Sequence, residues 1–269
     1  MREQEHQIDS RAGDLHRERE KREQVGRERA AQAPRMWAEE DFNCLRKNHP
    51  PVPLRHLIPT AEARNRPPIL FVHGGGWAFG SINASLGLSR KLASVCDRPV
   101  VSVGYRLAPE YPFPAALEDV STAINAIRPQ CVVGASAGAT LALQALSLAD
   151  KPATTQALLF YGIWKQIEHS SHDDQALTVK ALAAHLARYA PGQEHQAVHL
   201  DTSRLPKNLG IQLVCGEGDI LFDSNRDFAA QLGEQTSFVA VPERGHGFLN
   251  RWADDSLARV VLDAACREL

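Results

Sequence analysis

A serine lies between two glycines in residues 134–138, which read GASAG, the G-x-S-x-G spacing of a serine nucleophile. The segment follows the apolar residues 131–133, a predicted strand, and precedes residues 137–149, a predicted helix rich in small side chains. A serine on such a strand-to-helix turn is strained, so its neighbours must be small. The pattern predicts Ser136 as a nucleophile, and the alternative is a tight turn that carries a serine by chance.

Three consecutive glycines follow the predicted strand at residues 69–72, in the segment 73–77, which reads HGGGW. Glycines leave backbone N–H groups unshielded and let the chain approach a ligand closely. Esterases use such a loop to supply oxyanion donors together with the N–H that follows the nucleophile. The alternative is a flexible glycine turn in which His73 only holds the loop.

An acidic residue follows the predicted strand at residues 211–215, and Asp219 is the expected orienting acid. Catalytic residues of open α/β sheets gather at the carboxyl ends of the strands. A carboxylate there can accept the Nδ1 proton of a histidine and stabilise the imidazolium. Glu217 and Asp223 are rivals for this role, because either could also cap the helix that follows.

A histidine between two glycines, His246, follows the last predicted strand, residues 238–241. Its position completes the chain order Ser136, Asp219, His246 that is expected of α/β-hydrolases. In such a triad the histidine takes the proton from the serine as it attacks and returns it to the leaving group. The three residues together predict acyl transfer through a covalent intermediate.

The elements that must position these residues alternate between strand and helix. Short apolar strands that alternate with helices predict a mostly parallel sheet covered on both faces, an α/β fold. The further strands are expected at residues 100–103 and 157–160. The further helices are expected at residues 86–95, 115–127, 222–232 and 256–269.

One long segment interrupts the alternation. Residues 163–206 contain no clear strand, and residues 176–189 have the pattern of a helix. A long insertion between core strands is often a lid over an active site. We therefore expect a hydrolase domain over residues 51–269 with a lid insertion at about 163–206.

The first 50 residues differ from the rest in composition. They interleave arginine and glutamate, and pairs such as Glu18 and Arg22 have the favourable helical order. A proline-rich boundary at residues 49–53 cannot continue a helix. We expect residues 1–50 to be a charged extension, helical or partly disordered and mostly solvated, with a partner-binding helix or a piece of the lid as alternatives.

Composition limits the class of protein. The 269 residues are 43% hydrophobic and carry a formal net charge of −2, which gives no reason to expect a nucleic-acid partner. The first thirty residues contain no apolar run typical of a secretory signal, and no run in the chain approaches the roughly 20 residues of a membrane span, so a cytoplasmic protein is expected. Five scattered cysteines without a C-x-x-C pair argue for a reducing compartment: Cys44, Cys96, Cys131, Cys215 and Cys266.

Histidines in the expected lid form two polar groups. One is His195 with His199, and the other contains His169, His172, Asp173 and Asp174. Neither has the H-E-x-x-H pattern of a zinc site. We interpret both groups as solvated lid surface and expect neither a metal nor a cofactor.

Taken in chain order, several segments between about residues 67 and 248 resemble the hormone-sensitive-lipase-like family of esterases. The resemblance implies an α/β-hydrolase with a helical cap that acts on short acyl esters. It also implies an oxyanion hole from the N–H groups of Gly75, Gly76 and Ala137. The segments that carry it are HGGGW at 73–77, YRLAPE at 105–110, FPAALED at 113–119, the Ser136 turn, Asp219 and HGF at 246–248.

The chain departs from the family pattern at several places. Ala135 replaces the usual aspartate before the nucleophile, Ala139 a usual glycine, and Ile220 the usual proline after the aspartate. The link from Asp119 to Cys131 is shorter than usual, and the N-terminal region lacks the apolar residues of a family cap. These changes leave the triad intact and bear on the shape of the pocket.

The expected function is that of a serine carboxylesterase for short-chain, small-molecule acyl esters. The alternatives are an N-formyl amide hydrolase of the kynurenine formamidase type, an esterase for carrier-bound methyl esters, and a catalytically silent ligand receptor. The sequence leaves the oligomeric state open. Aromatic residues that adjoin the catalytic segments are expected to close the pocket, namely Trp77, Tyr161, Trp164, Phe222 and Phe248.

Overall fold

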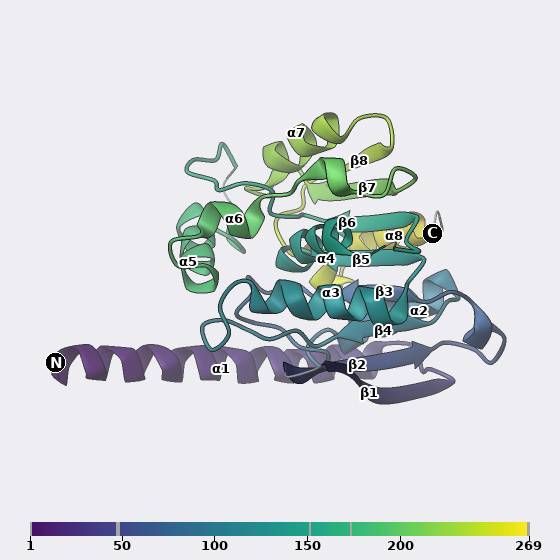
Figure 1. The fold of residues 1–269 in the computed structure, drawn as a ribbon, viewed down its shortest axis with the longest axis horizontal. Helices are drawn as coiled ribbons and strands as arrows, with labels where there is room; N and C mark the ends of the chain where they lie inside the picture. Colours follow the sequence, from purple (N-terminus) through teal and green to yellow (C-terminus); the bar gives the residue numbers. More distant parts are fainter. Residues whose placement is uncertain (1, 47–48, 151, 173, 268–269) are drawn as a thin grey trace.

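The computed structural model describes residues 2–46, 49–150, 152–172 and 174–267, with side chains of the first helix from residue 13 onward. Within these residues, eight strands form one sheet in the order β1-β2-β4-β3-β5-β6-β7-β8 (Figure 1). The strands β3 to β8 run parallel, and β1 and β2 add an antiparallel end. Their bounds are β1 (Ala38–Arg46), β2 (His49–Ile58), β3 (Ile69–Val72), β4 (Val100–Val103), β5 (Cys131–Ala135), β6 (Gln156–Phe160), β7 (Gly210–Gly216) and β8 (Thr236–Val241).

Helices cover both faces of this sheet, which confirms the predicted fold class (Figure 1). Apolar side chains of α3, α4 and α7 pack on one face, and those of α2 and α8 pack on the other. The helices are α1 (Arg2–Gln32), α2 (Leu86–Cys96), α3 (Ala115–Ile127), α4 (Ala137–Leu148), α5 (Val179–Tyr189), α6 (Glu194–Val198), α7 (Phe222–Leu232) and α8 (Ser256–Cys266). Short 3₁₀ turns lie at Glu62–Asn65, Thr202–Arg204 and Phe248–Arg251.

The sheet begins before the proline-rich boundary that the sequence suggests at residue 50. Strand β2 contains Pro50, Pro51 and Pro53, and β4 pairs with β2 only from Leu54 to Leu57. The part of β2 that contains the prolines therefore pairs with β1 alone. A proline lacks a backbone N–H, and in a segment with one neighbouring strand this loss costs few hydrogen bonds. Residues 38–46 and 49–58 belong to the sheet, and the helix α1 precedes them.

Helix α1 lies along the body of the protein rather than standing free in solvent. The helix has almost no apolar stripe and instead packs through its backbone at Gly26. A Cβ on Gly26 would lie 2.4 Å from the Cα of Ala84. The Arg19 guanidinium donates hydrogen bonds to the carbonyl oxygens of Ala78 and Ala108, both at 2.9 Å. Figure 1 shows α1 running beneath the α5–α6 segment. The helix is thus a packed part of the fold.

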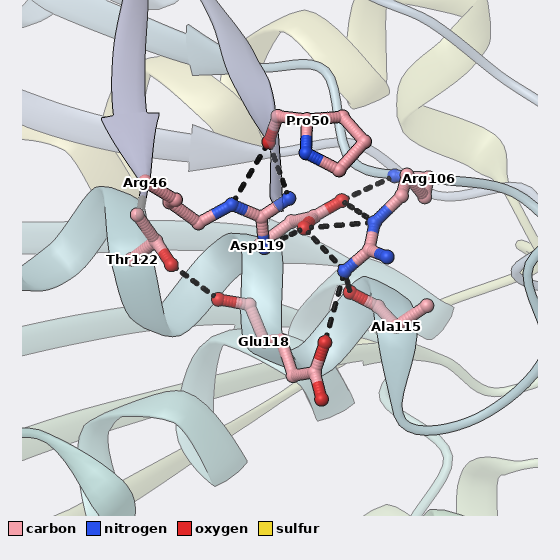
Figure 2. Close-up of polar contacts among 7 residues, drawn as sticks. All are labelled: Arg46, Pro50, Arg106, Ala115, Glu118, Asp119 and Thr122. Atoms are coloured by element: carbon pink, nitrogen blue, oxygen red, sulfur yellow. Dashed lines mark hydrogen bonds and ion pairs between the residues drawn. The ribbon is translucent and has the colours of Figure 1, made fainter. Parts of the chain in front are cut away.

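A buried carboxylate ties the antiparallel end of the sheet to the helical layer (Figure 2). Asp119 of α3 is 1% exposed, and its oxygens accept hydrogen bonds from the backbone and side-chain nitrogens of Arg106 at 2.8–3.1 Å. Arg46 of β1 approaches the same carboxylate at 2.7 Å and also donates to the Pro50 carbonyl. Two cations on one carboxylate hold β1, β2 and the loop after β4 together.

Asp119→Asn should therefore destabilise the protein by about 3 kcal/mol, because Arg46 loses its anion in a buried site and Arg106 keeps only the half-exposed Glu118. Urea unfolding would measure this change. The matched control is Asp41→Asn, which removes an exposed partner of Arg55 and should cost less than about 1 kcal/mol. Equal effects of the two substitutions would contradict the role given to Asp119.

Candidate active site

Ser136 occupies a strained turn between β5 and α4. Its backbone angles are φ 54° and ψ −126°, and its N–H donates to the Phe160 carbonyl at 2.9 Å. A Cβ on Gly134 would lie 2.6 Å from the Gly138 carbonyl oxygen, and one on Gly138 would lie 2.2 Å from the Val72 carbonyl oxygen. Both glycines are therefore required by close backbone packing, as the G-x-S-x-G spacing predicts.

The three residues expected to form a triad lie in one chain of hydrogen bonds. Ser136 Oγ is 2.9 Å from His246 Nε2, and His246 Nδ1 is 2.8 Å from Asp219 Oδ2. Asp219 is fully buried, and its second oxygen accepts the backbone N–H of Leu221 at 2.9 Å. This geometry lets the imidazole accept the serine proton while the carboxylate faces the developing positive charge.

The two rival carboxylates lie elsewhere. Glu217 is exposed, and Asp223 forms ion pairs with His172 at 3.5 Å and with Arg226 at 3.0 Å. Of the three acids that follow β7, Asp219 is the one that contacts His246.

The glycine loop after β3 lies beside the serine. Gly75 has φ +130° and Gly76 has φ +56°, and both line the same cavity as Ser136. Among the described residues, no hydrogen-bond partner is found for the N–H groups of Gly75, Gly76 and Ala137. Three N–H groups next to a reactive hydroxyl are suited to stabilise an oxyanion.

His73 supports this loop from beneath. Its ring stacks on Tyr105 with 4.2 Å between ring centroids, and its Nδ1 lies 2.9 Å from the Gly74 carbonyl oxygen. Burial lowers the pKa of His73 to about 4. The ring is therefore neutral at physiological pH and positions the loop, in keeping with the structural role considered for it.

A cavity of about 840 Å³ opens above Ser136. Its walls come from the glycine loop, from the segment between β6 and α5, from the loop around His246, and from α1. Of the alternatives considered for the N-terminal segment, this geometry favours a helix that forms part of the lid over the active site. The residues of α1 that line the cavity are Glu18, Lys21, Arg22, Val25 and Arg29.

Of the five aromatic residues expected to close the pocket, only Tyr161 lines the cavity, with its ring 4.9 Å from the His246 ring. Trp77 is fully buried and stacks on Tyr189 of α5 at 4.8 Å. Its backbone has a positive φ of 56°, and the indole lies in the core. The pocket role predicted for Trp77 is therefore wrong.

The other three aromatic residues also pack away from the cavity. Trp164 stacks on Phe228 of α7 at 4.3 Å and donates its indole N–H to Asn225 at 2.9 Å. Phe222 packs against Phe238 at 5.6 Å, and Phe248 is fully buried. Adjacency in sequence to a catalytic segment did not reveal which way these rings face.

Asp174, which the sequence suggested only as part of a polar lid cluster, connects the lid to the histidine loop. It is 6% exposed, and Oδ2 accepts the backbone N–H of His246. Oδ1 accepts the N–H of Ala176 at 2.7 Å, and a Cβ on Gly245 would lie 2.9 Å from it. Asp174 thus helps to fix the loop that presents the imidazole.

His185 of α5 is a second residue that the sequence did not single out. Its ring would contact a Cβ on Gly76 at 2.7 Å, so the lid helix lies against the glycine loop. Burial first, and then the positive charges of Arg188 and Arg22, lower the pKa of His185 to about 4. The ring is neutral near pH 7 and adds no charge next to the oxyanion site.

Asp173, of the polar lid group that also contains His169, His172 and Asp174, lies outside the described residues. Within the described part of the chain, no three potential metal ligands come together. His195 and His199 stack on each other with centroids 5.5 Å apart. No helix among the described residues is both long and apolar enough to cross a membrane.

Comparisons of the sequence with known proteins agree on one family. A sequence model of the family described as alpha/beta hydrolase fold matches residues 69–250. Carboxylesterase NlhH of Mycobacterium tuberculosis is 28% identical over 228 residues, which cover 74% of this chain and 72% of that protein. Versiconal hemiacetal acetate esterase stcI of Emericella nidulans is 39% identical, but the alignment spans only 34% of each chain.

Solved structures share the fold over almost the whole chain. An esterase of Pyrobaculum calidifontis superposes with a TM-score of 0.84 at 23% identity, over 94% of this chain and 92% of that one. Esterase LipW of Mycobacterium marinum superposes with a TM-score of 0.83 at 26% identity, over 96% and 89%. The first of these likenesses concerns the fold alone.

Asp174→Asn should lower kcat for 4-nitrophenyl butyrate by roughly tenfold to 100-fold with a smaller change in KM, because the histidine loop loses a charged acceptor. Steady-state kinetics would measure the changes in kcat and in KM separately. Asp201→Asn is the matched control, since Asp201 accepts the N–H of Ser203 in the same kind of turn outside the cavity. Identical kinetics for the two variants would show that Asp174 does not position His246.

Proposed function

The chain belongs to the α/β-hydrolase fold family, and from this membership we propose that it is a serine carboxylesterase that uses Ser136, His246 and Asp219. The observation that carries the proposal is the hydrogen-bond chain from Ser136 Oγ through His246 to the buried Asp219 carboxylate. The carboxylesterase and esterase names of the relatives support it. The resemblance to hormone-sensitive-lipase-like esterases points to the same reaction class.

The proposed reaction has two acyl-transfer steps. Ser136 Oγ attacks the ester carbonyl while His246 Nε2 takes its proton, and the oxyanion receives hydrogen bonds from Gly75, Gly76 and Ala137. The tetrahedral intermediate collapses as His246 gives the proton to the departing alcohol, which leaves an acyl-serine. Water, deprotonated by His246, then releases the acid and restores Ser136.

We propose small acyl groups as substrates because one wall of the cavity is mainly charged. Apolar side chains near the serine include Ile163, Leu177 and Leu182, whereas the wall from α1 is mainly charged. Each methylene that binds apolar surface contributes about 0.8 kcal/mol, so a long chain needs a long apolar slot. The charged wall supplies none, which favours acyl groups of about two to six carbons.

Ser136→Ala should lower kcat for 4-nitrophenyl butyrate by about 10⁶-fold, because no other group supplies the nucleophile. Asp219→Asn should lower it by about 10⁴-fold, and Glu217→Gln, on the same loop, is the control that should change it little. Thermal unfolding of each variant checks that the fold is retained. Activity of Ser136→Ala within tenfold of the wild type would refute the assignment.

The same assay separates the substrate classes. A series of 4-nitrophenyl esters from acetyl to dodecanoyl should show the highest kcat/KM at six carbons or fewer. N-formylkynurenine and a carrier-bound methyl ester are the two comparison substrates. A higher kcat/KM for either comparison substrate than for every short ester would replace the carboxylesterase proposal with that reaction.

A further inference from the structure

The wall of the cavity formed by α1 and by the 3₁₀ turn after the histidine loop is rich in cations. On α1 the lining positions 18, 21, 22, 25 and 29 follow helical spacing, so one stripe of the helix faces the cavity. Carboxylates are fewer in the lining and comprise Glu18, Asp174 and Glu243. The cationic lining residues are Lys21, Arg22, Arg29, Arg244 and Arg251.

Two of these cations already have partners. Arg22 donates to Glu18 at 2.9 Å, and its guanidinium also lies 4.3 Å from the centre of the Phe79 ring. Arg244 forms an ion pair with Asp255 at 2.8 Å, outside the cavity. Their charges are therefore largely compensated within the protein.

The other three, Lys21, Arg29 and Arg251, form what we name the basic cluster. No described side chain forms a hydrogen bond or an ion pair with any of the three. Arg29 and Arg251 come from elements far apart in the sequence, yet they are close enough for their charges to repel each other. Lys21 and Arg251 are exposed and Arg29 is half-buried, so Asp254 and water offset part of the repulsion, and a negatively charged ligand in the cavity would offset more of it.

The surroundings of Arg29 strengthen this point. Burial has the largest effect on the pKa of Arg29 and lowers it; the charge of Arg251 also lowers this pKa, by less than Asp254 raises it. Asp254 and Glu28 act in the opposite direction, although neither forms an ion pair with it. The guanidinium is therefore partly desolvated and forms no ion pair with a described residue.

We propose that the basic cluster is an anion subsite that binds a carboxylate carried by the substrate, so that the preferred esters are acidic ones. The inference rests on the proposed esterase function, because it names the substrate class of the same cavity. The guanidinium groups of Arg29 and Arg251 would hold the carboxylate, since a planar fork of N–H donors matches its two oxygens. Lys21, two to three turns from Arg29 along α1, adds long-range attraction.

The proposal accounts for the position of α1. A helix with almost no apolar stripe is docked by Arg19 and by the close contact at Gly26, and it presents its cations to the cavity that contains Ser136. A neutral ester would gain nothing from such a wall. The carboxylate of an acidic ester would balance the positive charges of the basic cluster and would orient the ester group toward Ser136.

Matched pairs of esters test the proposal. The carboxylate is placed on the acyl side in mono-4-nitrophenyl adipate, with 4-nitrophenyl hexanoate as its neutral counterpart. It is placed on the alcohol side in 4-acetoxybenzoate, with methyl 4-acetoxybenzoate as the counterpart. In at least one pair, kcat/KM of the acidic ester should exceed that of the neutral ester by about tenfold at low ionic strength, and the ratio should fall as NaCl is added.

Variants show whether the basic cluster causes the preference. Arg29→Gln combined with Arg251→Gln should bring the ratio of kcat/KM for the acidic ester to kcat/KM for the neutral ester to about one, chiefly by lowering kcat/KM for the acidic ester. Arg27→Gln is the matched control, because Arg27 lies on the same helix, is exposed and does not line the cavity. A ratio of one or below in both pairs, or a ratio that the double variant leaves unchanged, overturns the inference.

The two proposals fail in different ways. Hydrolysis of the neutral esters without a preference for the acidic ones overturns the anion subsite and leaves the esterase proposal intact. If no ester is hydrolysed, the esterase proposal fails, and calorimetry with Ser136→Ala decides the subsite. Monomethyl adipate should then bind, dimethyl adipate should bind at least tenfold more weakly, and the Arg29 and Arg251 substitutions should remove the difference; equal binding of the two esters overturns it.

Discussion

The hydrogen-bond chain Ser136–His246–Asp219 depends on one constraint, the parallel direction of β5, β7 and β8. Their carboxyl ends meet at a single edge of the sheet, so three loops distant in sequence converge there. Adjacent strands lie about 4.8 Å apart, and a short loop after each is enough to bring the side chains into contact. The strained backbone at Ser136 is tolerated because β5 and α4 fix both sides of the turn.

Two segments outside the parallel core complete the site. The insertion between β6 and β7 contributes Asp174 and His185, which contact the histidine loop and the glycine loop respectively. Helix α1 supplies the opposite, charged wall of the cavity. The core therefore presents the reactive groups, while the added segments determine which molecules reach them. This division of roles is common in α/β folds, where loops and insertions vary around a fixed sheet.

Sequence reasoning located the elements of the parallel core because buried strands and amphipathic helices follow strong periodic patterns. It missed β1 and β2, because β1 is rich in charged residues and β2 in prolines, and neither composition is typical of a strand. Pairing with neighbouring strands overrides these weak local preferences. It singled out Ser136, Asp219 and His246, which the structure joins by hydrogen bonds, because their types and positions relative to the strands are restrictive. It did not identify which aromatic side chains line the cavity, because the burial of Trp77 goes with a tertiary contact, the stacking of its ring on Tyr189, that no local pattern reveals.

The central claim is that Ser136 is a nucleophile activated by the hydrogen bonds that converge on it. Incubation with a fluorophosphonate, followed by mass spectrometry of the digested protein, tests this claim most directly, because the reagent phosphonylates an activated serine with loss of fluoride. The account predicts a single adduct, on the peptide that contains Ser136, whose rate of formation falls sharply in Asp219→Asn. An unmodified protein, or an adduct on another residue, would contradict it.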